Sequence, residues 1–227
     1  MNTLPISKLA LASFAFAMTH IKSIVKLSLV PLALAVPFLS TMPQILALME
    51  KLYGGEDITT VVLPDNMHLY LALFVYGYTV LSIGVYRLVV QGGVQNLGWM
   101  PLIGIKQFLR FLGLSIVVGA ATTLPVMLTG MPLIQLVVYF LIIPITLNFV
   151  NIALDRPSQY KWGLSFPVQF NLFFLQAVLP ALVGLLFATL FEVLGLPNAL
   201  EWIVRVLVFY WTLINLALCY QLLVQKS

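Results

Sequence analysis

The feature that most constrains this chain is the length of its stretches without charge. Asp, Glu, Lys and Arg are absent from residues 27–49, 66–86, 111–154, 162–191 and 206–225. A helix needs about 20 predominantly apolar residues to cross the hydrocarbon core of a membrane. The whole chain is 62% hydrophobic and 8% charged, so a water-soluble fold would expose one large apolar surface. We therefore predict an all-α, polytopic integral membrane protein.

These stretches divide into six transmembrane helices within a single membrane domain. Residues 111–154 are long enough for two spans, and Thr129–Pro132 supply turn residues between them. Barrel strands are excluded because the long Leu, Val and Phe runs do not alternate with polar residues. The predicted spans cover about residues 27–49, 66–86, 111–129, 132–154, 167–191 and 202–224.

The basic residues predict the orientation of the spans. If the N-terminus is cytoplasmic, every Lys and Arg except Lys51 and Arg205 falls on the cytoplasmic side. Cytoplasmic loops of membrane proteins carry such an excess of positive charge. Both termini are therefore expected in the cytoplasm.

Amphipathic basic segments precede the first, third and fifth spans, and we predict that they lie in the membrane plane. In the first, Phe14 and Met18 would face lipid while Lys8 and Lys22 stay nearer water. A cleaved signal peptide is disfavoured because basic residues follow its apolar core. A shorter first span or a disordered start stays an alternative. The predicted segments are residues 4–22, 99–110 and 160–166.

Three short sequences carry a resemblance to a known family. They are Ser28-Leu29-Val30-Pro31, then Gly84-Val85-Tyr86-Arg87-Leu88-Val89-Val90-Gln91-Gly92, and then Leu154-Asp155-Arg156-Pro157. In this order the chain resembles the uncharacterised bacterial six-span proteins of the YciC kind and the membrane domain that precedes some glycerophosphodiester phosphodiesterases. The resemblance implies a multi-pass protein of the bacterial inner membrane with unassigned activity, and it transfers no catalytic residue.

Charged residues near the membrane surfaces give two candidate sites. Arg205 interrupts an apolar run, and Glu201 lies one helical turn before it, so we predict an interfacial ion pair. The alternative is a role for Arg205 in binding a ligand or partner. A second set could form a cytoplasmic rim for anionic lipid head groups, or could serve orientation alone. It comprises Arg87, Lys106, Arg110, Arg156 and Lys161.

Polar residues inside the spans could line a solute path, but they more often bond across helices. A polar cavity joining Asn148 and Gln176 would favour transport, and a dry packed centre would favour a structural role. Prolines 31, 37 and 43 are predicted to kink or unwind the first span. The polar set is Tyr76, Tyr78, Gln135, Asn148, Asn151, Gln169, Asn171, Gln176 and Asn215.

Small residues at four-residue spacing predict close helix packing within the bundle, with a homodimer face as the alternative. They are Ser115, Gly119 and Thr123 in one span and Gly184 and Ala188 in another.

Catalytic and cofactor chemistry has little support in the residues. His20 and His68 fall on opposite sides of the predicted membrane, and Cys219 is the single cysteine, so we expect no metal or cofactor. There is no HExxH, CxxC or glycine-rich phosphate loop, and the basic residues follow a membrane rule, so nucleic acid is not expected. The sequence predicts a non-enzymatic structural or accessory subunit that contacts lipid, itself or other membrane proteins. The alternative is a small-solute transporter or channel subunit, and an intramembrane enzyme is third.

Overall fold

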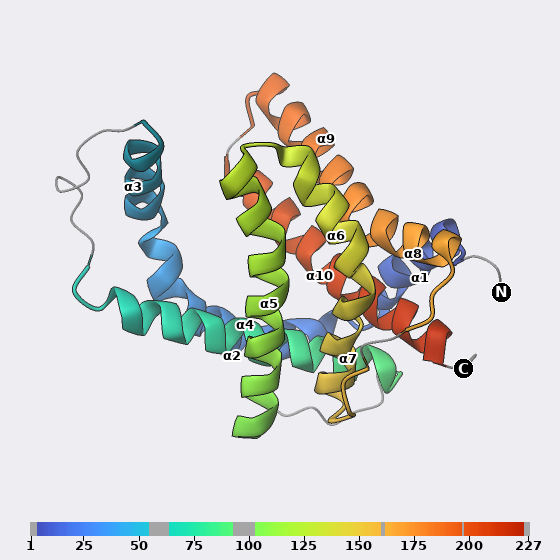
Figure 1. The fold of residues 1–227 in the computed structure, drawn as a ribbon. Coiled ribbons are helices and arrows are strands. Elements are labelled where there is room, and N and C mark those ends of the chain that lie inside the picture. Colours follow the sequence, from blue (N-terminus) through green and yellow to red (C-terminus); the bar gives the residue numbers. More distant parts are fainter. Residues whose placement is uncertain (1–3, 55–63, 93–102, 160–161, 197, 225–227) are drawn as a thin grey trace.

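A computed structural model describes residues 4–54, 64–92, 103–159, 162–196 and 198–224. All the secondary structure within these ranges is helical (Figure 1). Six helical segments are long and apolar enough to cross a membrane, which confirms the predicted all-α, six-span class. The elements are α1 (Ile6–Thr19), α2 (Ile21–Ser40), α3 (Met42–Gly54), α4 (Met67–Val90), α5 (Ile105–Thr129), α6 (Pro132–Thr146), α7 (Asn148–Ala153), α8 (Phe166–Phe173), the π-helical segment η2 (Phe174–Val178), α9 (Leu179–Val193) and α10 (Asn198–Val224).

The α2–α4 pair is the most closely packed part of the molecule. The two helices run side by side in opposite directions (Figure 1). A Cβ atom added at Gly77 would lie 2.8 Å from the carbonyl oxygen of Pro31, and one at Gly84 would lie 2.7 Å from Cδ2 of Leu27. At Gly77 only glycine allows this approach to the backbone of α2, whereas at Gly84 the neighbouring atoms belong to the Leu27 side chain.

The α5–α6 hairpin lies in front of the α2–α4 pair in Figure 1 and runs across it. Its turn is at Gly130, whose φ of 66° is left-handed and suits glycine. The Gly130 N–H donates to the Val126 carbonyl over 2.8 Å and so closes the last turn of α5. The predicted turn between Thr129 and Pro132 is confirmed.

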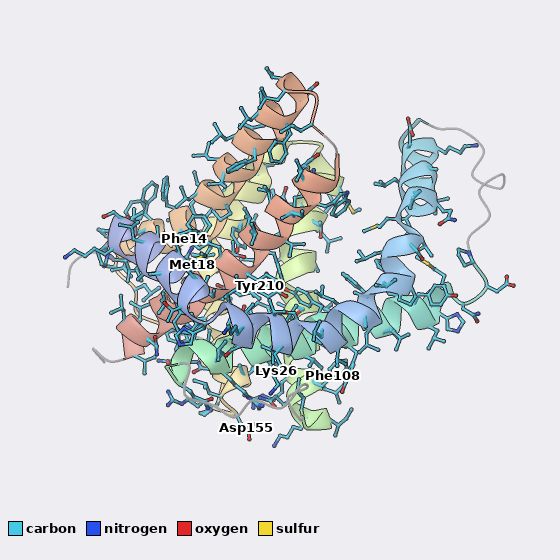
Figure 2. The ribbon with its side chains drawn as sticks, turned by 180° about the vertical axis from the view of Figure 1, so that it is seen from behind. Phe14, Met18, Lys26, Phe108, Asp155 and Tyr210 are labelled. Carbon is cyan, nitrogen blue, oxygen red and sulfur yellow. The ribbon has the colours of Figure 1, made fainter. Side chains whose placement is uncertain are left out.

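The core lies around the second half of α10, where Ile214, Ala217 and Cys219 are fully buried. α1 packs along this helix and buries Leu9 against the bundle. Its opposite face exposes Phe14 and Met18 (Figure 2). The predicted N-terminal helix is therefore present, with an apolar outer face, and its orientation in the membrane plane stays a prediction.

The first span differs from its predicted bounds of 27–49. Its helix, α2, begins at Ile21 and continues through Pro31 and Pro37, but it ends at Ser40. Pro43 has no N–H to donate to the Leu39 carbonyl, and here, unlike at Pro31 and Pro37, one helix ends and another begins. The Thr41 N–H instead donates to the Phe38 carbonyl over 3.0 Å, and α3 begins as a separate helix.

The predicted in-plane segments before the third and fifth spans also differ from the structure. Ile105–Arg110 form the first turns of α5 itself rather than a separate helix. Trp162–Ser165 contain no helix before α8 begins. Trp99, Tyr160 and Lys161 lie outside the described residues. The fourth span is divided at Leu147 into α6 and α7, and there the Leu147 N–H donates to the Pro144 carbonyl over 3.3 Å.

Candidate functional site

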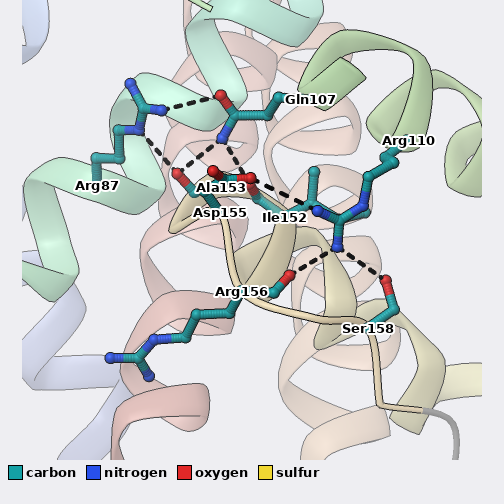
Figure 3. Close-up of polar contacts among 8 residues, drawn as sticks. All are labelled: Arg87, Gln107, Arg110, Ile152, Ala153, Asp155, Arg156 and Ser158. Carbon is teal, nitrogen blue, oxygen red and sulfur yellow. Dashed lines mark hydrogen bonds and ion pairs between the residues drawn. The ribbon is translucent and has the colours of Figure 1, made fainter. Parts of the chain in front are cut away.

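Arg87 and Gln107 close the C-terminal end of α7 (Figure 3). Arg87 donates from Nε to the Ala153 carbonyl over 2.8 Å and from Nη2 to Oε1 of Gln107 over 3.0 Å. The Gln107 amide donates to the carbonyls of Ile152, over 2.5 Å, and Ala153, over 3.1 Å. The last carbonyls of a helix have no partner within it. The Ile152 carbonyl also accepts from the Asp155 N–H over 3.0 Å, and the two side chains supply the hydrogen bonds to the Ala153 carbonyl.

Arg110 holds the loop that follows α7 (Figure 3). Its Nη2 donates to the Arg156 carbonyl over 2.6 Å and lies 3.4 Å from Oγ of Ser158. Its Nη1 lies 3.6 Å from Oδ1 of the exposed Asp155. This guanidinium therefore fixes the loop between the fourth and fifth spans.

A chain of hydrogen bonds continues from this loop to α10. Nη1 of Arg156 donates to the Tyr220 hydroxyl over 3.1 Å, and that hydroxyl donates to Oδ1 of Asn151 over 2.6 Å. The Asn151 amide donates to Oδ1 of Asn148 over 3.1 Å. Asn148 also donates to the Gln159 carbonyl over 2.8 Å and accepts from the Gln159 N–H over 2.7 Å. The amides of Asn148 and Asn151 are thus spent on the protein itself.

The structure therefore brings three members of the predicted rim together, but as internal braces. Arg87, Arg110 and Arg156 all bond to protein atoms, whereas Lys106 is exposed. Lys161 lies outside the described residues. Gln107 was missed by sequence reasoning, and its only sequence signal is a polar residue in the first turn of a span. Binding of lipid head groups by this rim stays a prediction.

A cavity of about 320 Å³ lies between α4, α5, α6, α7, α10 and η2, and we call it the central cavity. It is open to the surface of the bundle, because Tyr78 and Gly119 in its lining are exposed. None of the described residues in its lining is charged. The walls combine aromatic rings with hydroxyl and amide groups, which could hydrogen-bond a small molecule. The polar side chains of the lining are Tyr78, Tyr86, Ser115, Tyr139, Thr146, Gln176 and Thr212.

Gln176 reaches this cavity from the π-helical segment η2. Pro180 has no N–H to donate to the Gln176 carbonyl, which accounts for the wider helical turn at this point. Such π-helical turns are frequent at functional sites. The Nε2 atom of Gln176 lies 3.4 Å from the Thr212 carbonyl on α10, which is a long contact. The second N–H and the Oε1 atom of this amide can therefore bond a molecule in the cavity.

The hydroxyl protons of the cavity are mostly committed to the helices. Ser115 donates to the Phe111 carbonyl over 3.0 Å, Thr146 to Ile143 over 2.6 Å, and Thr212 to Phe209 over 2.7 Å. Each hydroxyl oxygen keeps lone pairs that can accept a hydrogen bond. A molecule in the cavity therefore meets acceptors from these three side chains and the phenol groups of the tyrosines.

Three further polar residues of the spans bond elsewhere or lie buried, whereas Gln135 is exposed. Gln169 donates to the Phe140 carbonyl over 2.7 Å, and Asn171 donates to the Leu4 carbonyl over 2.8 Å. Asn215 is fully buried, and its amide atoms have no hydrogen-bond partner among the described residues. Of the two residues named for a solute path, only Gln176 lines the central cavity.

Neither glycine among the predicted small-residue positions makes a close contact with another described helix, and the alternative of a homodimer face stays a prediction. A Cβ atom added at Gly119 or Gly184 would meet no atom within 4 Å. Ser115 and Gly119 line the central cavity, while Gly184 and Ala188 line a groove between α9 and α10. The Thr123 hydroxyl donates to the Gly119 carbonyl within its own helix. The close approaches of α4 are at Gly77 and Gly84. These glycines are seven residues apart, so the four-residue pattern does not include them.

The predicted Glu201–Arg205 ion pair is confirmed. Nε and Nη2 of Arg205 donate to Oε1 of Glu201 over 3.0 and 2.5 Å. The guanidinium carbon lies 5.5 Å from the ring centroid of Trp202. The Arg205 side chain is still 62% exposed, so it can meet other groups at the surface.

Among the described residues, no group of three or more His, Cys, Asp or Glu side chains could hold a metal ion. Comparison of the chain with protein-family models, curated proteins and solved structures found no match.

Proposed function

We propose that this membrane protein binds a small uncharged molecule in the central cavity and passes it across the membrane. The observation that carries the proposal is the cavity itself, a space of about 320 Å³ with seven polar side chains from different spans. The polar walls, contributed by several spans, favour a ligand site over a gap between packed helices, because membrane helices associate through close packing.

The lining supports an uncharged molecule as the ligand. A charged solute in the interior of the bundle would need a counter-charge, since unpaired charge is costly there. The lining, as far as the structure describes it, offers no Asp, Glu, Lys or Arg. Its hydroxyl and amide groups suit molecules that carry hydroxyl or amide groups of their own. The volume is near the lower end of ligand pockets, which run from about 300 Å³ upwards, so polyols and urea are appropriate first test solutes.

Uptake into reconstituted liposomes tests the proposal. After a hyperosmotic pulse of glycerol or urea, stopped-flow light scattering follows the re-swelling of the vesicles. Vesicles that contain the protein should re-swell faster than empty ones. Gly119→Trp should abolish the gain because the indole ring would occupy the cavity.

Gly113 offers a matched control on the same helix. It is exposed, a Cβ atom there would meet nothing within 4 Å, and it does not line the cavity. Gly113→Trp should therefore keep the uptake rate. Equal rates for empty and protein-containing vesicles with every test solute would contradict the proposal, as would equal losses in the two tryptophan variants.

A second candidate function, a structural or accessory subunit, is favoured by the exposure of α5. Only 6% of the residues in its most apolar stretch are buried, compared with 50% in the corresponding stretch of α4. Ile116, Val117 and Leu124 are exposed along this helix, so a partner protein or lipid must cover them. Purification from native membranes with a stoichiometric partner chain would support this candidate, and recovery of the chain alone would count against it.

A further inference from the structure

The groove between α9 and α10 differs chemically from the central cavity. Its volume is about 450 Å³, and apolar side chains form its walls while Glu201 and Arg205 stand at one end. A second hollow of about 340 Å³ adjoins it, with Ala188 and Glu201 common to both and Glu192 on the far side. An apolar channel thus leads to a charged end.

Small residues keep this groove open. Gly184 forms part of its floor, and a Cβ atom added there would meet no atom within 4 Å. Ala188, one turn later, contributes only a methyl group. Leu185 on the same helix is largely exposed, so the groove is open at the outer surface of the bundle.

The charged end carries both signs. Arg205 spends Nε and Nη2 on Glu201, and a guanidinium has five N–H donors in all, so further donors can serve an external acceptor. Glu192 is exposed, and Glu201 is 30% exposed despite its ion pair. Two carboxylates against one guanidinium leave a formal charge of about −1 at this end, which disfavours an anionic ligand.

We propose that the groove binds one phospholipid with a zwitterionic head group that carries a primary ammonium, as in phosphatidylethanolamine. One of the two acyl chains lies along the apolar walls. The phosphate accepts hydrogen bonds from Arg205, and the ammonium donates to Glu192 and Glu201. A phosphatidylcholine head group has the same charges but no N–H donors. A phosphatidylglycerol head group has no cation for the carboxylates. The site is independent of the central cavity and of the proposed transport.

Native mass spectrometry of the purified protein tests this site. The protein is incubated separately with palmitoyl-oleoyl phosphatidylethanolamine, phosphatidylcholine and phosphatidylglycerol at equal concentrations, and bound lipid is counted. We expect phosphatidylethanolamine to bind about tenfold more tightly than phosphatidylglycerol, the ratio expected from one well-placed charged contact. Phosphatidylcholine should fall between them.

Two kinds of variant locate the binding. Gly184→Leu fills the groove and should lower phosphatidylethanolamine binding about tenfold, whereas Gly113→Leu, on the exposed face of α5, should leave it unchanged. Glu192→Gln and Arg205→Gln, both at exposed positions, should each reduce the preference for phosphatidylethanolamine over phosphatidylglycerol. Helical circular dichroism and a monodisperse elution peak confirm folding of each variant.

Three results would overturn the inference. Phosphatidylglycerol could bind as tightly as phosphatidylethanolamine, or Gly184→Leu and Gly113→Leu could weaken binding equally. Alternatively, Gly184→Leu could dissociate a homodimer without changing bound lipid, which would make a second copy of the chain the occupant. Since the groove is separate from the central cavity, Gly184→Leu should leave uptake unchanged, so failure here is distinguishable from failure of the transport proposal.

Discussion

The α2–α4 and α9–α10 pairs both contain small residues at helical spacing, Gly77 with Gly84 and Gly184 with Ala188, but the two pairs use them differently. In the first pair, Gly77 lets α4 approach the backbone of α2 until no Cβ atom would fit, and Gly84 makes room for the Leu27 side chain. In the second, Gly184 faces open space that leads to Arg205 and Glu201. Small residues in membrane helices therefore mark either a close contact or a hollow, and the partner helix decides which.

The largest expected effect tests the close contact. Gly77→Leu should lower the free energy of unfolding by about 3 kcal/mol, since the added atoms must displace the backbone of α2 at Pro31. Gly119→Leu, which enters open space, should change it by less than about 0.5 kcal/mol. Unfolding by SDS titration in mixed micelles measures both. Equal losses in the two variants would show that α5 packs as closely as α4.

The two ends of the bundle give a second contrast. Arg87 braces one end through hydrogen bonds, whereas the other end is open and carries an exposed ion pair. Arg87→Met should cost about 2 kcal/mol, since it removes two charged hydrogen bonds and leaves the Ala153 carbonyl with less support. Lys106→Met is the control, as Lys106 is exposed at the same end. The same titration measures both variants, and a loss below that of Lys106→Met would refute the bracing role.

A smaller effect is expected at the hydroxyl that joins α10 to α7. Tyr220→Phe removes the contacts with Arg156 and Asn151 but keeps the ring in the core. It should cost about 1 kcal/mol, and Tyr70→Phe on α4 is the control because Tyr70 is only partly buried. Thermal unfolding in detergent, followed by circular dichroism, compares them. If Tyr220→Phe and Tyr70→Phe melted at the same temperature, the Tyr220 hydroxyl would contribute nothing to the stability of this end.

The spans could be predicted from sequence because each helix must satisfy its own backbone within the membrane, which makes the signal local. The Glu201–Arg205 pair was also local, at one helical turn. The end of α2 at Ser40 was misplaced because charge-free length does not register the missing N–H of Pro43. The roles of Gln107, Gly77 and the central cavity depend on distant segments, so no window of sequence contained them.

The smallest expected effect concerns the ion pair at the open end. Glu201→Gln removes the charge that Arg205 contacts, but both side chains reach the surface, and exposed pairs contribute about 0.2–1 kcal/mol. We expect the free energy of unfolding to fall by less than about 0.5 kcal/mol. This loss is well below the one expected for Arg87→Met at the other end. Glu192→Gln, for which the structure gives no ion pair among the described residues, is the control, and SDS titration compares the two. A loss as large as that of Arg87→Met would mean that the α9–α10 end is held together by charge, and the contrast between a braced end and an open end would no longer stand.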